Sequence, residues 1–269
     1  SGSFSAGLFP EEIAWTAAGQ QILAGFVSDS SSGTVTVFDA AGQVLETIFL
    51  PDPFEFGSCF PFGVVAAPDQ ERVYVGTLDG SGNIYALDTA TLEVREDETL
   101  NVPGGHGRLA FFGRTLVVPV TEYDPSFTSS EARVVFVDPA HPFSALTVPI
   151  PSGATFPSAQ DVAVRCDGRV FLAGVFLGAR IHVLDARTPS YVGWFPSTTS
   201  GGLHQGLALS SHGLLAVADY ASEEIAFVDW WTEQGLDLVD HTALPDVHSD
   251  PEELVFSKDG EKLWAICNG

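Results

Sequence analysis

Short alternating runs of apolar and polar residues recur along the chain, and five of them end in an aspartate. The runs are rich in β-branched residues, and turn-forming residues follow the aspartate, as at Ala40–Gly42. Alternation with a period of two is the pattern of a β-strand with one buried face. The aspartates recur every 44 to 50 residues, so the pattern indicates a repeated sheet unit. The five runs are Val35–Asp39, Ile84–Asp88, Val134–Asp138, Ile181–Asp185 and Ile225–Asp229.

A second apolar run precedes each of these, for example Val73–Thr77 and Val170–Gly174, and a sixth copy is Leu263–Cys267. Still shorter runs stand before the second ones, and turns such as Cys166–Gly168 join the two. No stretch of a dozen residues keeps apolar side chains at three- and four-residue steps, so the sequence predicts no helical layer. Each repeat is therefore predicted to be an antiparallel sheet of about four strands, the blade of a β-propeller. The short first runs are centred on Ile13, Val64, Leu109, Val162, Leu207 and Leu254.

Two of these runs carry a resemblance to a known family. Val73–Thr77 followed by Ile84–Thr91 resembles the strand pair and turn of the YVTN-type repeat propellers, relatives of the lactonase-like and NHL-like propellers. The resemblance extends from about Phe9 to Gly269 and implies a single all-β domain, 1–269, built as a six-bladed β-propeller of four-stranded antiparallel blades. The last repeat stops before its third strand, so Ser3–Phe9 is expected to pair with the last blade and close the ring. The alternative is a piece of a longer propeller.

Charge narrows the choice of partners. Aspartate and glutamate number 35 against 11 lysine and arginine, which gives a net charge of -24. This field repels nucleic acid and favours cations, cationic ligands or basic protein surfaces. No apolar run reaches the roughly 18 residues that a membrane-spanning helix needs. The acidity, the few lysines and a start at Ser1 without methionine favour an extracytoplasmic location: periplasmic, secreted or surface-tethered.

The propeller resemblance also implies where a site would lie. In known propellers the residues just before each innermost strand ring the upper mouth of the central channel, and the loops between second and third strands lie on the same face. Here those positions hold acidic groups, two histidines and an arginine. The alternative is that they are ordinary solvated residues at strand starts. The rim segments are Glu11–Glu12, Phe62–Gly63, His106–Arg108, Gln160–Asp161, His204–Gly206 and Glu252–Glu253.

Loops on the same predicted face add aromatic groups. The longest runs from Thr121 to Ala132 and contains Tyr123, and another carries Tyr220. Long loops on a regular scaffold often carry binding specificity, although a simple insertion explains this one equally well. We therefore count Arg108, Gln160, Gln205, Tyr123, Phe62 and Tyr220 as candidate binding residues.

Two classes of function fit these residues. The first, which the sequence favours, is a non-catalytic propeller that binds a cation, a small molecule or a protein at its upper face. The second is a metal-dependent lactonase, lyase or related hydrolase in which His106 and His204 move protons beside a bound ion. Carboxylate oxygens suit calcium, whereas added imidazoles would admit a transition metal. The candidate ligands of a divalent cation are Glu12, Asp161, Glu253 and Glu252.

Overall fold

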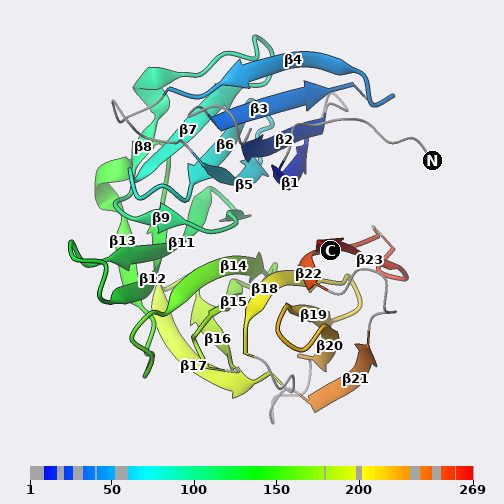
Figure 1. Ribbon diagram of the computed structural model, residues 1–269. Helices are drawn as coiled ribbons and strands as arrows, with labels where there is room; N and C mark the ends of the chain where they lie inside the picture. Colours follow the sequence, from blue (N-terminus) through cyan, green and yellow to red (C-terminus); the bar gives the residue numbers. More distant parts are fainter. Residues whose placement is uncertain are drawn as a thin grey trace. The chain divides into compact units, whose positions relative to one another are not determined.

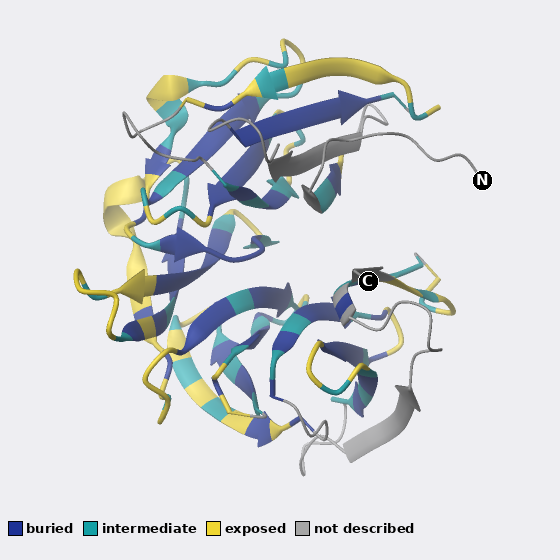
Figure 2. Ribbon diagram, viewed as in Figure 1, coloured by how far each residue is buried: buried dark blue, intermediate teal, exposed yellow. Residues whose placement is uncertain are grey.

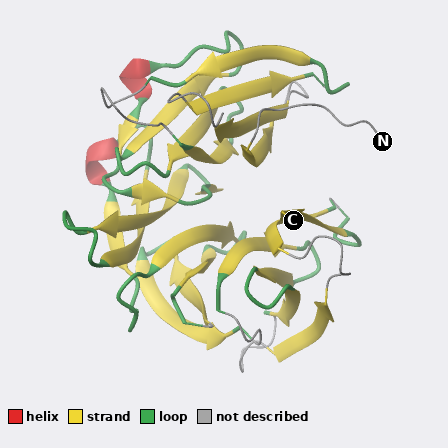
Figure 3. Ribbon diagram, in the orientation of Figure 1, coloured by secondary structure: helices red, strands yellow, loops and turns green. Residues whose placement is uncertain are grey.

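The computed structural model describes residues 9–16, 21–26, 33–39, 41–51, 60–178, 180–197, 202–230, 237–243, 250–257 and 259–268. The chain divides into two compact units. The first comprises Ser1–Glu122 and Val137–Ala145, and the second comprises Tyr123–Phe136 and Leu146–Gly269. Strands make up nearly all of the regular structure, as Figure 3 shows. Among the described residues the helices are short 3-10 turns, and none is long and apolar enough to span a membrane.

The first unit contains two four-stranded antiparallel sheets, each ordered along the chain (Figure 1). Alternating β-branched residues form the strands and also the core between the sheets, where Val35, Val37, Val73, Val75 and Leu87 pack together. The outer strand of the first sheet is exposed, whereas the strand beside it is buried along its whole length (Figure 2). The strands are β1 (Phe9–Trp15), β2 (Gln21–Phe26), β3 (Gly33–Phe38) and β4 (Val44–Phe49), then β5 (Pro61–Ala66), β6 (Arg72–Thr77), β7 (Asn83–Asp88) and β8 (Leu100–Asn101).

The strands that follow, β9 to β13, belong to both units. In the first unit β11 (Thr115–Tyr123) pairs with β10 (Ala110–Phe112) and with β9 (Gly105–His106). In the second unit β12 (Ser130–Val137) pairs with β13 (Leu146–Pro149). Two 3-10 turns, η1 (Glu96–Glu98) and η2 (Pro142–Ser144), lie in the connections between third and fourth strands.

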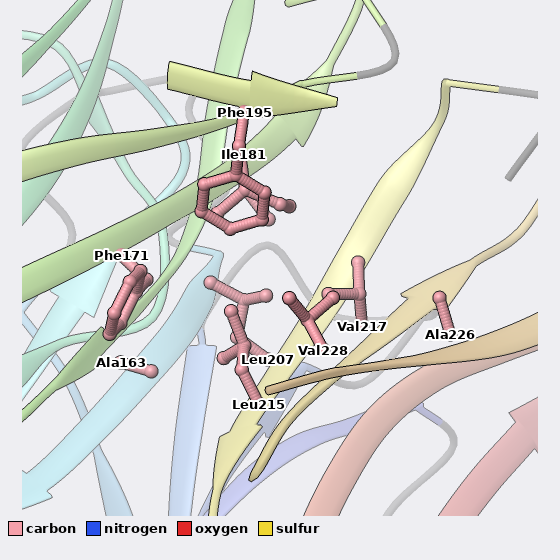
Figure 4. Packing of buried hydrophobic residues seen from close by; sticks show 10 residues of the cluster. Ala163, Phe171, Ile181, Phe195, Leu207, Leu215, Val217, Ala226 and Val228 are labelled. Carbon is pink, nitrogen blue, oxygen red and sulfur yellow. The ribbon is translucent and has the colours of Figure 1, made fainter. Parts of the chain in front are cut away.

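The second unit continues the same pattern with two four-stranded sheets and a two-stranded one. A core of Phe171, Ile181, Phe195, Leu207 and Leu215 packs between the first two sheets (Figure 4). The strands are β14 (Ser158–Val164), β15 (Arg169–Val175), β16 (Arg180–Asp185) and β17 (Ser190–Pro196), then β18 (His204–Leu209), β19 (Leu214–Asp219), β20 (Glu224–Asp229) and β21 (Asp237–Ala243), and finally β22 (Asp250–Phe256) and β23 (Leu263–Asn268).

The five repeated aspartates occupy equivalent places, which confirms that part of the prediction. Each stands at the end of the third strand of its sheet. Asp88 Oδ1 accepts hydrogen bonds from the backbone N–H groups of Ala90 and Thr91, and Asp39, Asp138 and Asp185 make the same kind of turn. Aspartate recurs there because its short side chain bonds to the backbone two residues on and ends the strand. Backbone donors also hold the pKa of Asp88 below its usual value.

The first strands share an irregularity that bears on the predicted rim. A β-bulge shifts the register of each first strand in five of the sheets. A bulge re-aims the side chain that follows it. The bulges lie between Pro10/Glu12, Pro61/Gly63, Ala159/Asp161, His204/Gly206 and Pro251/Glu253, so five of the six predicted rim segments lie wholly at them.

Closure of a ring by the N-terminus stays a prediction. Ser3–Leu8 lie outside the described residues, and Phe9 pairs with Phe26 in the first sheet. The last sheet has two strands, β22 and β23, among the residues that the structure describes. The single domain 1–269 likewise stays a prediction.

Candidate functional site

Two of the predicted rim carboxylates are bonded to the backbone of the neighbouring sheet. In the first unit Glu12 Oε2 accepts a hydrogen bond from the backbone N–H of Val64 at 2.5 Å. In the second unit Asp161 Oδ2 accepts one from Leu207 at 2.6 Å, and Asp161 is only 5 % exposed. A carboxylate that accepts a backbone N–H makes a strong, charge-assisted bond. Both groups therefore join the first strands of adjacent sheets, a role that a repeat structure needs.

The other two predicted metal ligands, Glu252 and Glu253, lie on β22 at the bulge between Pro251 and Glu253. Glu253 is half-buried, and the side chain of Glu252 lies outside the described residues. Within the part of the chain that is described, no group of three or more His, Cys, Asp or Glu side chains is placed to hold a metal ion. The divalent-cation site stays a prediction.

His106 is fully buried and bonded through both ring nitrogens. Nδ1 accepts a hydrogen bond from the backbone N–H of Thr77 at 3.3 Å, and Nε2 lies 2.7 Å from the carbonyl oxygen of Val102. This arrangement needs the neutral ring with its proton on Nε2. The ring thus ties the end of β6 to the segment before β9, and its nitrogens are engaged with the backbone.

His204 is the second predicted catalytic histidine, and it lies in a buried group with Ser197 and Asp219. Ser197 Oγ is 2.6 Å from Nε2, and Asp219 Oδ2 is 3.7 Å from the same nitrogen. A catalytic serine and its aspartate contact opposite nitrogens of the ring, so this group lacks the geometry of a triad. Burial lowers the pKa of His204, and the charge of Asp219 opposes that shift.

The remaining rim residues contact one another or their own strand. Arg108 is only 4 % exposed, and its guanidinium lies 5.3 Å from the centre of the Phe62 ring, a cation–π contact. Gln160 Nε2 donates a hydrogen bond to Ser158 Oγ at 2.6 Å, and Gln205 is half-buried. Burial leaves Arg108 little surface for a ligand.

The two predicted loop tyrosines are exposed. Tyr123 packs its ring 5.9 Å from that of Phe127 in a loop organised by Asp124, whose carboxylate accepts backbone hydrogen bonds from Ser126, Thr128 and Ser129. These donors lower the pKa of Asp124, so its charged carboxylate is the centre of the hydrogen bonds within the loop. Tyr220 lies elsewhere, beside the connection that leads into β18.

A pocket in the second unit was not among the predicted sites. Its volume is about 600 Å³, a size typical of small-molecule sites, and we name it the Arg180 pocket. It lies at the end of the sheets where β15 ends and β16 begins, the face that the propeller resemblance marked as upper. A search of the sequence for polar residues misses this pocket because its wall is mostly apolar. The loop from Phe176 to Gly178, at the same end of the sheets, is the sequence feature that could have indicated it. It is lined by Gly153, Ala154, Phe176, Leu177, Gly178, Arg180, Gly202 and Leu203.

The loop that forms one wall of this pocket has unusual backbone geometry. Phe176 has φ of 58° and remains 54 % exposed, although bulky residues rarely adopt the left-handed region. Leu177 beside it is buried against Gly174, where any Cβ would overlap the carbonyl oxygen of Ser158. Strained backbone of this kind clusters at ligand sites. The loop therefore presents an aromatic ring to the pocket while burying its neighbour.

Hydrogen bonds hold a second segment of the pocket wall, Gly202 and Leu203. Gly202 donates its N–H to Asp219 Oδ2 at 3.0 Å, and Tyr220 donates its N–H to the carbonyl of Leu203 at 3.0 Å. Leu203 also forms a bridge with Val175. The predicted residues His204 and Tyr220 thus lie next to the pocket wall, and Asp219 fixes it.

Arg180 supplies the charge of the pocket. Its guanidinium lies 4.0 Å from the centre of the Trp194 ring, which fixes the plane of the group. No carboxylate in the described part of the chain forms an ion pair with Arg180. Among the described lining residues of the pocket there is no aspartate or glutamate either.

A third buried histidine, His182, lies on β16 two residues after Arg180. Its Nδ1 is 3.0 Å from the hydroxyl oxygen of Tyr191, and no described residue bonds to its Nε2. Burial lowers the pKa of His182 to about 4, opposed by the backbone of Leu177 and reinforced by the charge of Arg180. His182 is therefore a neutral ring at neutral pH.

Comparisons with known proteins place the fold. No protein-family model matches the chain, and no curated protein does, so the YVTN-type resemblance is not confirmed. Solved structures of low sequence identity do match. Hydrazine synthase of Kuenenia stuttgartiensis has 16% identity and a TM-score of 0.69, over 97% of this chain and 84% of that one. Virginiamycin B lyase of Staphylococcus aureus has 12% identity and a TM-score of 0.72, over 95% and 76%.

A third match is U3-55K, with 15% identity and a TM-score of 0.69, over 95% of this chain and 72% of that one. The Dos1 propeller also matches, with a TM-score of 0.68 at 14% identity. The names span enzymes and other proteins, so the likeness establishes architecture and leaves activity open. The chain has the fold of a β-propeller.

Proposed function

We propose that the protein is a non-catalytic, extracytoplasmic propeller that binds a small organic anion in the Arg180 pocket. The observation that carries this proposal is the guanidinium of Arg180 on the wall of a 600 Å³ pocket, without an ion pair to any described carboxylate. A planar guanidinium held on an aromatic face is well suited to bind a carboxylate through two parallel hydrogen bonds. The acidity of the chain supports the location.

The apolar part of the pocket indicates what the anion carries. Phe176 offers an exposed ring, Leu177 and Leu203 add aliphatic surface, and the glycines leave room for a flat group. An aromatic ring that stacks on Phe176 while its carboxylate meets Arg180 uses both features. We therefore propose an aryl carboxylate as the ligand class.

The contacts of the two buried histidines, His106 and His204, support binding without catalysis. His106 engages both nitrogens with backbone groups, and His204 has Ser197 and Asp219 near one nitrogen. A general base needs a nitrogen within hydrogen-bond reach of the substrate. Fully buried rings in these arrangements offer none, and this favours a binding role.

Titration of the protein with indole-3-acetate by calorimetry tests the proposal. We expect saturable binding by the unmodified protein. The affinity should fall about tenfold or more in Arg180→Gln, because a charge-assisted bidentate contact is lost. Arg180→Lys keeps the charge without the planar fork and should fall between the two. Binding by Arg180→Gln that equals that of the unmodified protein would contradict the assignment of this pocket.

We also propose that the six sheets are the blades of one closed ring. Its support is the repeated strand order of the sheets together with the propeller matches. A compact domain of this length has a radius of gyration of about 18 Å. Small-angle scattering is expected to give that value, whereas a value a third larger would mean that the chain does not close into one body.

A further inference from the structure

The second unit fills the space between two adjacent sheets with an aromatic and a cation. The ring of Trp230, directly after β20, packs 6.5 Å from that of Phe171 on β15. The guanidinium of Arg165 lies over the indole at 3.5 Å from its centre. Phe171 itself is fully packed within the core of this unit (Figure 4). This end of the space between the two sheets is therefore occupied by side chains of the chain itself.

The repeat places three residues of the first unit at equivalent positions. Ala67 corresponds to Arg165, because the turn hydrogen bond from Ala67 N–H to Arg72 matches that from Arg165 N–H to Arg169. Tyr74 then corresponds to Phe171, since each follows its arginine by two residues. Pro139 follows Asp138 as Trp230 follows Asp229, so proline replaces the tryptophan.

These exchanges leave a hollow where the second unit is filled. A cavity of about 510 Å³, which we name the Tyr74 cavity, lies in the first unit and is lined by both Ala67 and Pro139. Tyr74 and Phe111 form its aromatic wall, with ring centres 5.8 Å apart. The cavity thus has the position of the Trp230 indole and the Arg165 side chain, with neither present.

Tyr74 brings a polar group to this cavity. Tyr74 is only 6 % exposed, and no described residue forms a hydrogen bond with its hydroxyl. Burial and the nearby charges of Glu98 and Asp69 raise the pKa of Tyr74 to about 12, so the hydroxyl stays protonated. The hydroxyl keeps accessible surface on the cavity wall and has no partner among the described residues, so it is a position for a ligand atom.

The charges around the cavity favour a cation. Arg72 is neutralised by Glu98, at 2.6 Å, and by Asp88, at 3.3 Å, and Arg114 lies 3.9 Å from Asp138. Asp69 and Glu71 also line the cavity, and no described cation forms an ion pair with either. The described cations therefore leave part of the negative charge around the Tyr74 cavity unneutralised.

We propose that the Tyr74 cavity binds an aromatic ring that carries a positively charged amine. The ring would take the place of the missing indole between Tyr74 and Phe111, and the amine would lie toward Asp69 and Glu71. A free arylalkylamine and a tryptophan beside a lysine in a peptide share this chemistry. The inference is independent of the Arg180 pocket, which lies in the other unit and selects the opposite charge.

Calorimetric titration with tryptamine tests the inference. We expect tryptamine to bind at least tenfold more tightly than N-acetyltryptamine, which has the same ring but no charge. The decisive variant combines Ala67→Arg with Pro139→Trp and so copies the filling found in the second unit. It should lose tryptamine binding while keeping the affinity for indole-3-acetate, whose proposed site is elsewhere.

Tyr74→Phe, which gives this position the side chain of Phe171, is a second test that does not depend on the folding of the filled variant. It is expected to weaken tryptamine binding several-fold, with an unchanged melting temperature as the check on folding. The peptide acetyl-Lys-Trp-Lys-amide separates the two sources: tighter binding than tryptamine identifies a protein segment, and weaker binding identifies a free amine. Equal affinity for tryptamine and N-acetyltryptamine, or tryptamine binding that survives in the folded filled variant, would overturn the inference.

Discussion

Replacing Asp161 by alanine is expected to lower the free energy of unfolding by about 1–3 kcal/mol, because the buried N–H of Leu207 loses its acceptor. Asp161 Oδ2 lies 2.6 Å from that nitrogen and joins β14 to β18. Denaturation by urea, followed by tryptophan fluorescence, measures the change in midpoint. The loss should appear without any added ion.

Asp161→Asn is the matched control, since it keeps an oxygen acceptor in place and removes only the charge. It should recover a large part of the loss. Titration with calcium separates this linking role from the predicted metal site. If Asp161→Ala keeps the midpoint of the unmodified protein in chelator but no longer responds to calcium, the carboxylate holds an ion and the linking role is wrong.

The positions of the strands could be predicted from the sequence because each repeat is defined by features that span only a few residues. A period of two, a closing aspartate and a turn each follow from short-range chemistry, and Asp39, Asp88 and Asp138 all bear this out. Ring closure and domain extent depend on contacts between distant segments. Those contacts leave no periodic trace in a single sequence.

The sequence places the rim residues just before the first strands, whereas the structure has Glu12 within β1 and Asp161 within β14, and their hydrogen-bond partners were not predictable. Glu12 and Asp161 follow β-bulges, and the bulge turns each toward a backbone N–H of the adjacent sheet. A sequence shows that a carboxylate is at a strand start and says nothing of the donor opposite it. Charge alone suggested a cation site; the structure adds hydrogen bonds between strands at Glu12 and Asp161, and the cation site stays a prediction.

The two cavities were missed for different reasons. The Arg180 pocket has a mostly apolar wall of glycine, leucine and phenylalanine, and a search for polar clusters passes over it. The Tyr74 cavity arises from a difference between repeats: Ala67 and Pro139 stand where Arg165 and Trp230 stand in the second unit. Aligning the repeats residue by residue would have revealed that difference in the sequence.

Acidification is expected to destabilise the protein between about pH 6.5 and pH 4, and His182 should account for a large share of the effect. Burial lowers its pKa from 6.5 to about 4 in the folded chain. In that window the unfolded chain binds a proton that the folded chain excludes, so the free energy of unfolding falls as the pH falls. A shift of this size corresponds to about 3 kcal/mol at most.

His182→Gln tests this with little change in shape, because the amide can still bond to the hydroxyl of Tyr191. The difference in unfolding free energy between this variant and the unmodified protein should grow steadily more favourable to the variant as the pH falls from 6.5 to 4. His204, whose pKa is also lowered by burial, contributes to both curves. The lowered pKa values of Asp88, Asp138 and Asp185 act below this window in both proteins, so the difference isolates the imidazole. Two parallel curves across the window would mean that His182 takes up its proton equally in the folded and unfolded chains. The assignment of a buried, neutral ring to His182 would then be wrong.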